Sequence, residues 1–258
     1  MRPGVPTPER IQPDDSEYSS LSPTLIPNSS EDQLGLLALL NTSLTSQLVN
    51  ALNPTIHVNV GDALRLPFST NPRSSEIAEK CVSIACADWD NFETSWDFLN
   101  QPLIRPGLKG VSLEASWRNW EAQSTAAILR MQELETENNR LFIAAYGLEG
   151  ELQPEVPEDQ ITLARVDHRK DVAAFLSYST GCMMGRYSLD QPGLILADSC
   201  ESQVDQLADY EEKVGKSLNE VQFKPDSDGI IPVLDGEWFE DDIVARTREF
   251  LEVTFPES

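Results

Sequence analysis

The sequence predicts an α+β chain that is mostly helical, in which one long heptad-patterned helix is accompanied by short strands. The helix is predicted between Leu113 and Ala145, where apolar and small residues recur with gaps that alternate between four and three. Such spacing places them along one side of a helix. A strand is predicted at residues 55–60, which alternate apolar and polar side chains and are rich in β-branched residues.

The N-terminal part of the chain predicts an irregular lead-in followed by one helix. Residues 1–29 are rich in proline, serine and aspartate, which disfavour regular structure. The helix is expected to begin at Ser30 and to end at the Asn53-Pro54 pair, because leucines recur between them every three or four positions. After the strand, residues 64–68 predict a second short extended piece before Pro67 and Pro72 interrupt the chain.

A second helical region is expected next, with a helix at residues 75–87. The segment 88–104 then holds four aromatic residues, and Trp89, Phe92 and Trp96 would share one helix face. An aromatic stripe at this spacing is typical of a hydrophobic core. The alternative is stacking on a flipped or unpaired base, which the surrounding aspartates and glutamates disfavour.

The long helix is expected to begin at the N-cap Ser112, to end at Gly147 and to measure about 48 Å at 1.5 Å per residue. Its seam fits either a hairpin within the chain or a dimer, and Asn138 on the seam either fixes the register or is solvated. Further on, residues 149–170 predict a linker or long loop, 171–185 a helix and 189–197 an extended piece. The remaining expectations are a surface helix at 202–219, a short apolar strand or ligand-like segment at 230–234 and a last helix at 238–255.

Composition limits the classes of function. The net charge is −24, and residues 147–258 carry 25 acids against 9 bases, which is −16 of that total. Phosphate binding depends on lysine and arginine, so this chain is not expected to bind DNA tightly by itself. No stretch approaches the ~20 apolar residues that span a bilayer, and the first residues lack the apolar core of a secretory signal. We therefore expect a cytoplasmic protein that does not contact a membrane.

The cysteines and histidines predict neither a metal site nor a nucleophilic centre. Cys81, Cys86, Cys182 and Cys200 are expected to be free thiols. The first two could be combined with His57 and His168 into a zinc site, but the four-residue gap is loose and no second pair follows. The sequence contains no Walker loop, no G-x-G-x-x-G after a strand and no G-x-S-x-G elbow. No catalytic residue is predicted, and we leave open whether the chain takes part in an enzyme.

Several stretches together resemble a known family. They are LLALLNTSLTSQLVNALNPTIHVNVGDALRLPF (36–68), DWDNFETSWDFLNQPLI (88–104), NNRLFIAAYGLEGELQPEVPEDQITL (138–163), FLSYSTGCMMGRYSLDQPGLILAD (175–198) and DGIIPVLDGEWFEDDIVARTREFLEVTF (228–255). In this order they resemble the part that follows the catalytic domain in the PglX family, the adenine-specific DNA methyltransferases of BREX phage-defence systems. The resemblance covers about residues 22–256.

The resemblance implies a non-catalytic piece. Catalysis in such enzymes needs a glycine-rich loop for S-adenosylmethionine and an Asn-Pro-Pro-Tyr or Asn-Pro-Pro-Phe segment for the flipped base. The nearest runs here, at residues 53–56 and 71–74, lack the second proline and the aromatic residue. No cofactor is therefore expected in this chain, and S-adenosylmethionine would belong to the parent enzyme. Because the family's chain continues beyond the last matching element, we expect an internal fragment or a standalone piece of a split or decayed gene.

The resemblance also suggests a division of the chain and a set of DNA contacts. The expected parts are a disordered lead-in (1–21), the border of a target-recognition region (22–72), a helical spacer (73–150) and a truncated C-terminal module (151–258). The candidate DNA-binding residues are Asn53, His57, Asn59, Arg65, Arg73 and Arg186. For each residue the alternative is an ordinary structural role. Asn53 would end a helix, His57 and Asn59 would lie on the solvent-exposed face of a strand, and Arg65 and Arg186 would form ion pairs with the many acids. Arg65 and Arg73 are expected to face few acids.

The expected partners follow from the same resemblance. They are DNA in the context of the full enzyme, and a separate methyltransferase catalytic chain or other BREX proteins. The alternative function, based on the charge, is an acidic protein-interaction module or DNA mimic with no enzymatic parent.

Overall fold

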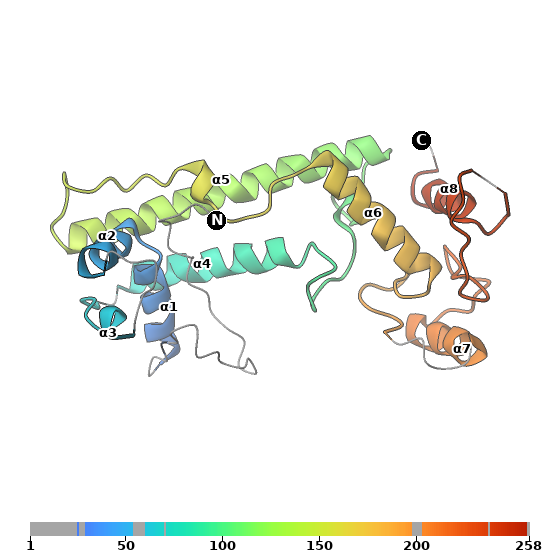
Figure 1. Cartoon of the computed structure of the whole chain (residues 1–258), viewed down its shortest axis with the longest axis horizontal. Coiled ribbons are helices and arrows are strands. Elements are labelled where there is room, and N and C mark those ends of the chain that lie inside the picture. Colours follow the sequence, from blue (N-terminus) through green and yellow to red (C-terminus); the bar gives the residue numbers. More distant parts are fainter. Residues whose placement is uncertain are drawn as a thin grey trace. The chain divides into compact units, whose positions relative to one another are not determined.

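The computed structural model describes residues 25, 29–53, 60–69, 71–197, 203–236 and 238–256. These residues form a mostly helical structure (Figure 1). Its helices are α1 (Ser30–Leu40), α2 (Ser43–Leu52), α3 (Val60–Ala63), α4 (Pro72–Trp89), α5 (Leu113–Ala145), α6 (His168–Met183), α7 (Gln203–Val214) and α8 (Ile243–Thr254), with the 3-10 turns η1 (Pro102–Ile104) and η2 (Glu158–Gln160).

The prediction of a mostly helical chain is confirmed, but the short strands are not. Within the described residues the only β-type pairing is an isolated bridge between Glu149 and Leu152. Residues 64–68, 189–197 and 230–234 are irregular instead of extended in a ladder. Pro67 and Pro232 lack the N–H group that a ladder requires, which helps explain why residues 64–68 and 230–234 pair with no other strand. The strand predicted at 55–60 lies outside the described residues, except for Val60, which begins α3.

The chain divides into two compact units. Unit 1 comprises residues 1–85 and 127–163, and unit 2 comprises residues 86–126 and 164–258. Both α4 and α5 contribute residues to each unit, so that neither unit is one continuous stretch of sequence.

In unit 1 the single helix predicted at residues 30–52 is two helices, α1 and α2, with a corner at Asn41 and Thr42. The Thr42 hydroxyl accepts a hydrogen bond from the Thr45 N–H (3.1 Å) and donates one to the Leu39 carbonyl (2.7 Å). Thr42 therefore caps α2 while satisfying the end of α1. The unbroken leucine spacing concealed this corner. The predicted start at Ser30 and the end at Asn53 are confirmed.

Two asparagines of α5 hold this corner. Asn138 donates a hydrogen bond to the Ala38 carbonyl (2.8 Å), and the Asn139 side-chain oxygen accepts one from the Ser43 N–H (2.9 Å). Both asparagines are buried, where a polar side chain needs a partner. Asn138 on the heptad seam thus binds another element of the same chain.

Helix α5 keeps its predicted bounds, with Ser112 accepting from the Ala115 N–H at its start and Gly147 at a positive φ of 67° after its end. Within unit 1 its C-terminal part lies along α4, as Figure 1 shows. Ile128 and Met131 pack with Val156, Ile161 and Leu163 of the following loop, against Cys81 and Ile84 of α4. The predicted loop at 149–170 therefore covers a hydrophobic surface of unit 1 over its first part, up to Leu163.

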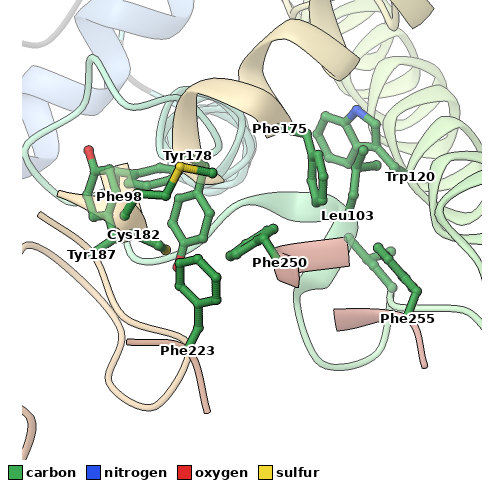
Figure 2. Close-up of a cluster of buried hydrophobic side chains, with 12 residues drawn as sticks. Phe98, Leu103, Trp120, Phe175, Tyr178, Cys182, Tyr187, Phe223, Phe250 and Phe255 are labelled. Carbon is green, nitrogen blue, oxygen red and sulfur yellow. The ribbon is translucent and has the colours of Figure 1, made fainter. Parts of the chain in front are cut away.

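Unit 2 is organised around an aromatic core from α5, α6, α8 and the loops between them (Figure 2). The rings of Tyr178 and Tyr187 are stacked with centroids 5.0 Å apart, and Phe98 meets Tyr187 edge-on at 5.5 Å. Phe250 of α8 lies edge-on to Phe175 of α6 at 5.6 Å. Helices α6 and α8 are therefore joined by aromatic side chains, whose burial contributes most to such a core.

The predicted aromatic stripe is wrong. Residues 90–100 form turns instead of a helix, so Trp89, Phe92 and Trp96 do not share a helix face. Trp96 is 100% exposed and Trp89 is 57% exposed. Asn91 explains where the helix ends, because its side chain donates to the Ala87 carbonyl (2.8 Å) and thereby replaces a backbone partner. Of the four aromatic residues in segment 88–104, only Phe98 belongs to the buried core cluster.

Helix α6 begins at His168, earlier than the sequence predicted, because the Asp167 carboxylate accepts from the N–H groups of Arg169 and Lys170. Gly181 and Gly185, near the end of this helix, have different roles. A side chain at Gly181 would meet the Tyr187 ring at 2.5 Å, whereas Gly185 ends the helix at a φ of +72°. The close approach is therefore made by an aromatic ring.

The last helices are shorter than predicted. Asp242 sets the start of α8, because its carboxylate accepts from the N–H groups of Val244 (3.0 Å) and Ala245 (2.9 Å). The residues from Trp238 to Asp242, which were expected to be helical, form the turn that precedes this cap.

Candidate nucleic-acid interface

The candidate DNA-binding residues of unit 1 begin with Asn53, the C-cap residue of α2. Its side-chain amide donates a hydrogen bond to the carboxylate of Asp62 in α3 (2.8 Å). Arg65 follows α3, and its backbone N–H donates to the Asp62 carbonyl (3.1 Å). Asp62 therefore gathers Asn53 and Arg65 at one turn, with the Arg65 side chain exposed to solvent. This turn offers one accessible cation beside a carboxylate.

Arg73 lies at the start of α4 and is already paired with acids. Its guanidinium forms ion pairs with Glu137 (2.8 Å) and Glu76 (3.3 Å), and these carboxylates raise its pKa. The expectation that Arg73 faces few acids is therefore wrong. A phosphate would have to displace Glu137 to bind this arginine, so that Arg73 is a weaker candidate than Arg65.

Beside Arg73 lies a small pocket of about 150 Å³, lined by Ser69, Asn71, Pro72, Leu141, Phe142 and Ala145. Ligand sites usually exceed about 300 Å³. The pocket is therefore too small to accommodate a nucleoside cofactor.

In unit 2 the Arg186 guanidinium lies over the ring of Tyr187, 5.5 Å from its centroid, and its Nε donates to the tyrosine hydroxyl (3.2 Å). That hydroxyl in turn donates to Glu93 (3.4 Å), which also accepts from Ser177 (3.4 Å). Burial raises the pKa of Tyr187, the hydrogen bond from Arg186 lowers it and Glu93 raises it. The arginine therefore lies on the outer side of a ring that packs into the core.

The six predicted residues thus fall into three groups. Asn53 and Arg65 meet at Asp62, Arg73 binds two glutamates, and Arg186 covers Tyr187. His57 and Asn59 lie outside the described residues.

The chain is similar in sequence to segments of two adenine-specific methyltransferases. The chain is 31% identical over 253 residues to the adenine-specific methyltransferase PglX of Lacticaseibacillus casei (strain Zhang), and the match covers 95% of this chain but 20% of that protein. It is 30% identical over 236 residues to the adenine-specific methyltransferase BrxX of Escherichia coli O9:H4 (strain HS), covering 86% of this chain and 19% of that one. The chain is homologous to one segment of PglX-type adenine-specific methyltransferases. No protein-family model matches it.

The PglX-related chain spans about a fifth of the length of these relatives. The likeness extends over nearly the whole chain, so both units lie within the matched segment.

Sequence reasoning missed a set of exposed apolar side chains in unit 2 of this PglX-related chain. Besides Trp96, they include Trp238 and Phe239, which were assigned to the last helix. The acids beside these aromatics gave no usable signal, because Phe98, Tyr210 and Phe250 also stand next to acids in the sequence and are buried.

The thiols and acids of the described residues are not arranged for metal chemistry. No group of three or more His, Cys, Asp and Glu side chains among them could hold a metal ion. Burial raises the pKa of the Cys81 thiol to about 12, so that it stays protonated and unreactive at neutral pH. No helix among the described residues has the length and apolarity to cross a bilayer.

Proposed function

We propose that this chain is a non-catalytic portion of a PglX-like adenine-specific DNA methyltransferase, serving in DNA recognition and in assembly with partner subunits. The observation that carries the proposal is the match with PglX, which extends over 95% of this chain while occupying only a fifth of the relative. A segment that is shared over nearly its whole length is expected to keep its role in the larger enzyme.

The proposed division of labour leaves methyl transfer to another part of the enzyme. The sequence has neither the glycine-rich loop nor the Asn-Pro-Pro-aromatic segment that such chemistry needs. S-adenosylmethionine would therefore bind to a catalytic portion, which is either a separate chain or another region of the enzyme. Acting on cytoplasmic DNA, this chain would help to position the duplex.

For DNA recognition we favour the turn at Asp62. Asn53 and Arg65 lie there together, and Arg65 presents an exposed guanidinium, the type of group that binds phosphates. The part of the chain proposed to border target recognition, residues 22–72, contains this turn. Residues 151–258 are proposed to contribute to assembly, because their excess of acids would repel phosphates.

The proposal is tested by purifying the tagged chain from its source cells. We expect a polypeptide with an Asn-Pro-Pro-aromatic segment to co-purify, and the complex to transfer methyl groups from S-adenosylmethionine to adenine in duplex DNA. The chain alone should bind no cofactor in calorimetry. Micromolar binding of S-adenosylmethionine to the isolated chain would contradict the non-catalytic assignment.

A second candidate function is supported by the net charge of −24. An acidic interaction module or DNA mimic would occupy a basic protein surface and would need no enzymatic parent. Co-purification of an unrelated basic protein, with no methyltransferase present, would favour this alternative.

A further inference from the structure

The loop that leads into α8 exposes an unusual number of large apolar side chains. We call residues 226–242 the apolar acidic segment. Its exposed side chains are Ile230 (65%), Val233 (78%), Leu234 (42%), Trp238 (73%) and Phe239 (58%). Single exposed apolar residues are ordinary, but a concentration of them within ten positions marks an interaction surface.

The charge of this segment has one sign. Residues 225–245 contain seven aspartates and glutamates and no lysine, arginine or histidine. All charged side chains of the segment itself are therefore carboxylates.

The segment is held in place by the core at its N-terminal end. The backbone N–H of Asp226 donates to the Met183 carbonyl at the end of α6 (2.6 Å). Ile231 packs against the aromatic core, so that its neighbour Ile230 faces solvent. The outward direction of Ile230 is thus determined by the packing of Ile231.

A second anchor lies at the C-terminal end. The Asp242 carboxylate accepts from the N–H groups of Trp238 (2.6 Å) and Phe239 (3.0 Å), in addition to the two that it accepts from α8. The Ile243 N–H donates to the Pro232 carbonyl (2.9 Å) and closes the loop. A loop fixed in this way loses less conformational freedom on binding than a free tail would.

We propose that the apolar acidic segment docks on another protein, in an apolar groove whose edges carry lysine or arginine side chains. Trp238 and Phe239 are of the type that dominates binding energy when it enters such a groove. The carboxylates around them, with no cation among them, favour a basic rim. The inference rests on the assembly part of the proposed function and assigns that role to one segment.

The charge also excludes other occupants. DNA and anionic membranes carry the same sign as the segment and would be repelled. A second copy of the chain would bring seven acids against seven acids, and like charges facing each other oppose association. A basic protein is the remaining occupant that matches both the apolar and the charged groups.

The test uses the full chain and two synthetic amphipathic helical peptides with the same leucine face, one with lysines and one with glutamates on its polar face. In calorimetry we expect micromolar binding of the lysine peptide and none of the glutamate peptide. The double variant Trp238→Ala with Phe239→Ala should bind at least ten-fold more weakly. The matched control is Trp96→Ala, which removes a fully exposed tryptophan elsewhere in unit 2 and should bind as the original chain does.

A third variant tests the charge: Asp235→Asn with Glu240→Gln and Asp241→Asn should weaken binding several-fold. Thermal melting should be alike for all variants, because the replaced side chains are exposed. Absence of binding to the lysine peptide, or equal binding of both peptides, would overturn the inference. So would binding that the double aromatic variant retains, since this would indicate general attraction to an acidic surface. No methyltransferase is present in this test, so its failure is distinct from failure of the proposed function.

Discussion

At the scale of the residue, three positions show how burial and hydrogen bonding decide what the sequence leaves open. Gly181 gives room to a tyrosine ring, Asp242 accepts hydrogen bonds from four N–H groups, and Glu135 is a partly buried carboxylic acid of α5. Each of them leads to a measurable effect on stability.

Replacing Gly181 with alanine should destabilise unit 2. The new methyl group would lie 2.5 Å from the Tyr187 ring, which must then move away from its stacked partner Tyr178. Overpacking of this kind costs about 1–3 kcal/mol, measurable by urea unfolding. Gly61→Ala is the control, because nothing lies within 4 Å of that position. Equal stability of the two variants would contradict the packing described for Gly181.

Asp242 should make stability depend on acid pH. Its four backbone hydrogen bonds favour the ionised carboxylate and lower its pKa to about 2. A lowered folded-state pKa contributes stability that is complete above the unfolded value of about 4 and is lost as the pH falls towards 2. Asp242→Asn should therefore be less stable than the original chain at pH 7, and the difference should vanish near pH 2. Thermal melting across this range measures it, and a difference that is constant with pH would refute the assignment.

Glu135 should have the opposite effect on stability, which should fall as the pH rises. Burial raises its pKa to about 7, so the folded state favours the protonated acid. The unfolded carboxyl ionises near pH 4.5, and the free energy of unfolding therefore falls as the pH rises from about 4.5 to 7. Glu135→Gln should be more stable by on the order of 3 kcal/mol at pH 8, and equal to the original chain at pH 4. Denaturant unfolding at both pH values measures this, and a gain that is also present at pH 4 would contradict it.

At the scale of the element, α5 and the segment 88–104 explain where sequence reasoning succeeded and failed. The helix α5 was predictable because its apolar period persists through 33 residues, and its caps have standard chemistry. The turns after Trp89 were not predictable, because the spacing of the three aromatics fits a helix that a single side chain, Asn91, ends. Local hydrogen bonding therefore outweighed periodicity.

Local hydrogen bonding also outweighed periodicity in the first predicted helix, which is two helices in the structure. The leucines of α1 and α2 keep one period across the corner, so periodicity alone gives no sign of it. Thr42 bonds to the backbone on both sides of the corner, and Asn138 and Asn139 reach it from about 100 residues away. Contacts that distant in sequence cannot be inferred from a local pattern. In the candidate interface, too, the pairing of Arg73 with Glu137 was hidden from the sequence for this reason.

Replacing leucines of α5 with alanine should lower stability strongly at a buried position and little at an exposed one. Leu134 is 1% exposed, and Leu134→Ala should lower the free energy of unfolding by about 2–5 kcal/mol through the lost contacts and the cavity. Leu129 lies on the same helix and is 49% exposed, so that Leu129→Ala should have little effect. Urea unfolding compares the two. A large effect at Leu129 would instead indicate that this face of α5 is covered by another molecule.

At the scale of the whole molecule, charge is the dominant property. With a net charge of −24, the chain alone should show no measurable binding to duplex DNA at ~150 mM salt. Any binding that appears at low salt should map to residues 22–72 and should disappear in the variant with both Arg65→Ala and Arg73→Ala. Fluorescence anisotropy with a labelled duplex measures both. Tight binding that survives this change, or that maps to residues 151–258, would place the DNA contact elsewhere.

The interleaving of the two units has an evolutionary consequence. The chain passes from one unit to the other inside α4, inside α5 and once more after Leu163, so two of the three crossings lie within a helix. A recombination event that exchanged either unit alone would have to join new sequence in the middle of helical turns and preserve their phase. The two units are therefore expected to be inherited together among PglX-type proteins. Where a gene fusion or deletion does divide this part of the sequence, the junction is expected in the loop after Leu163 more often than at residues 85 or 126.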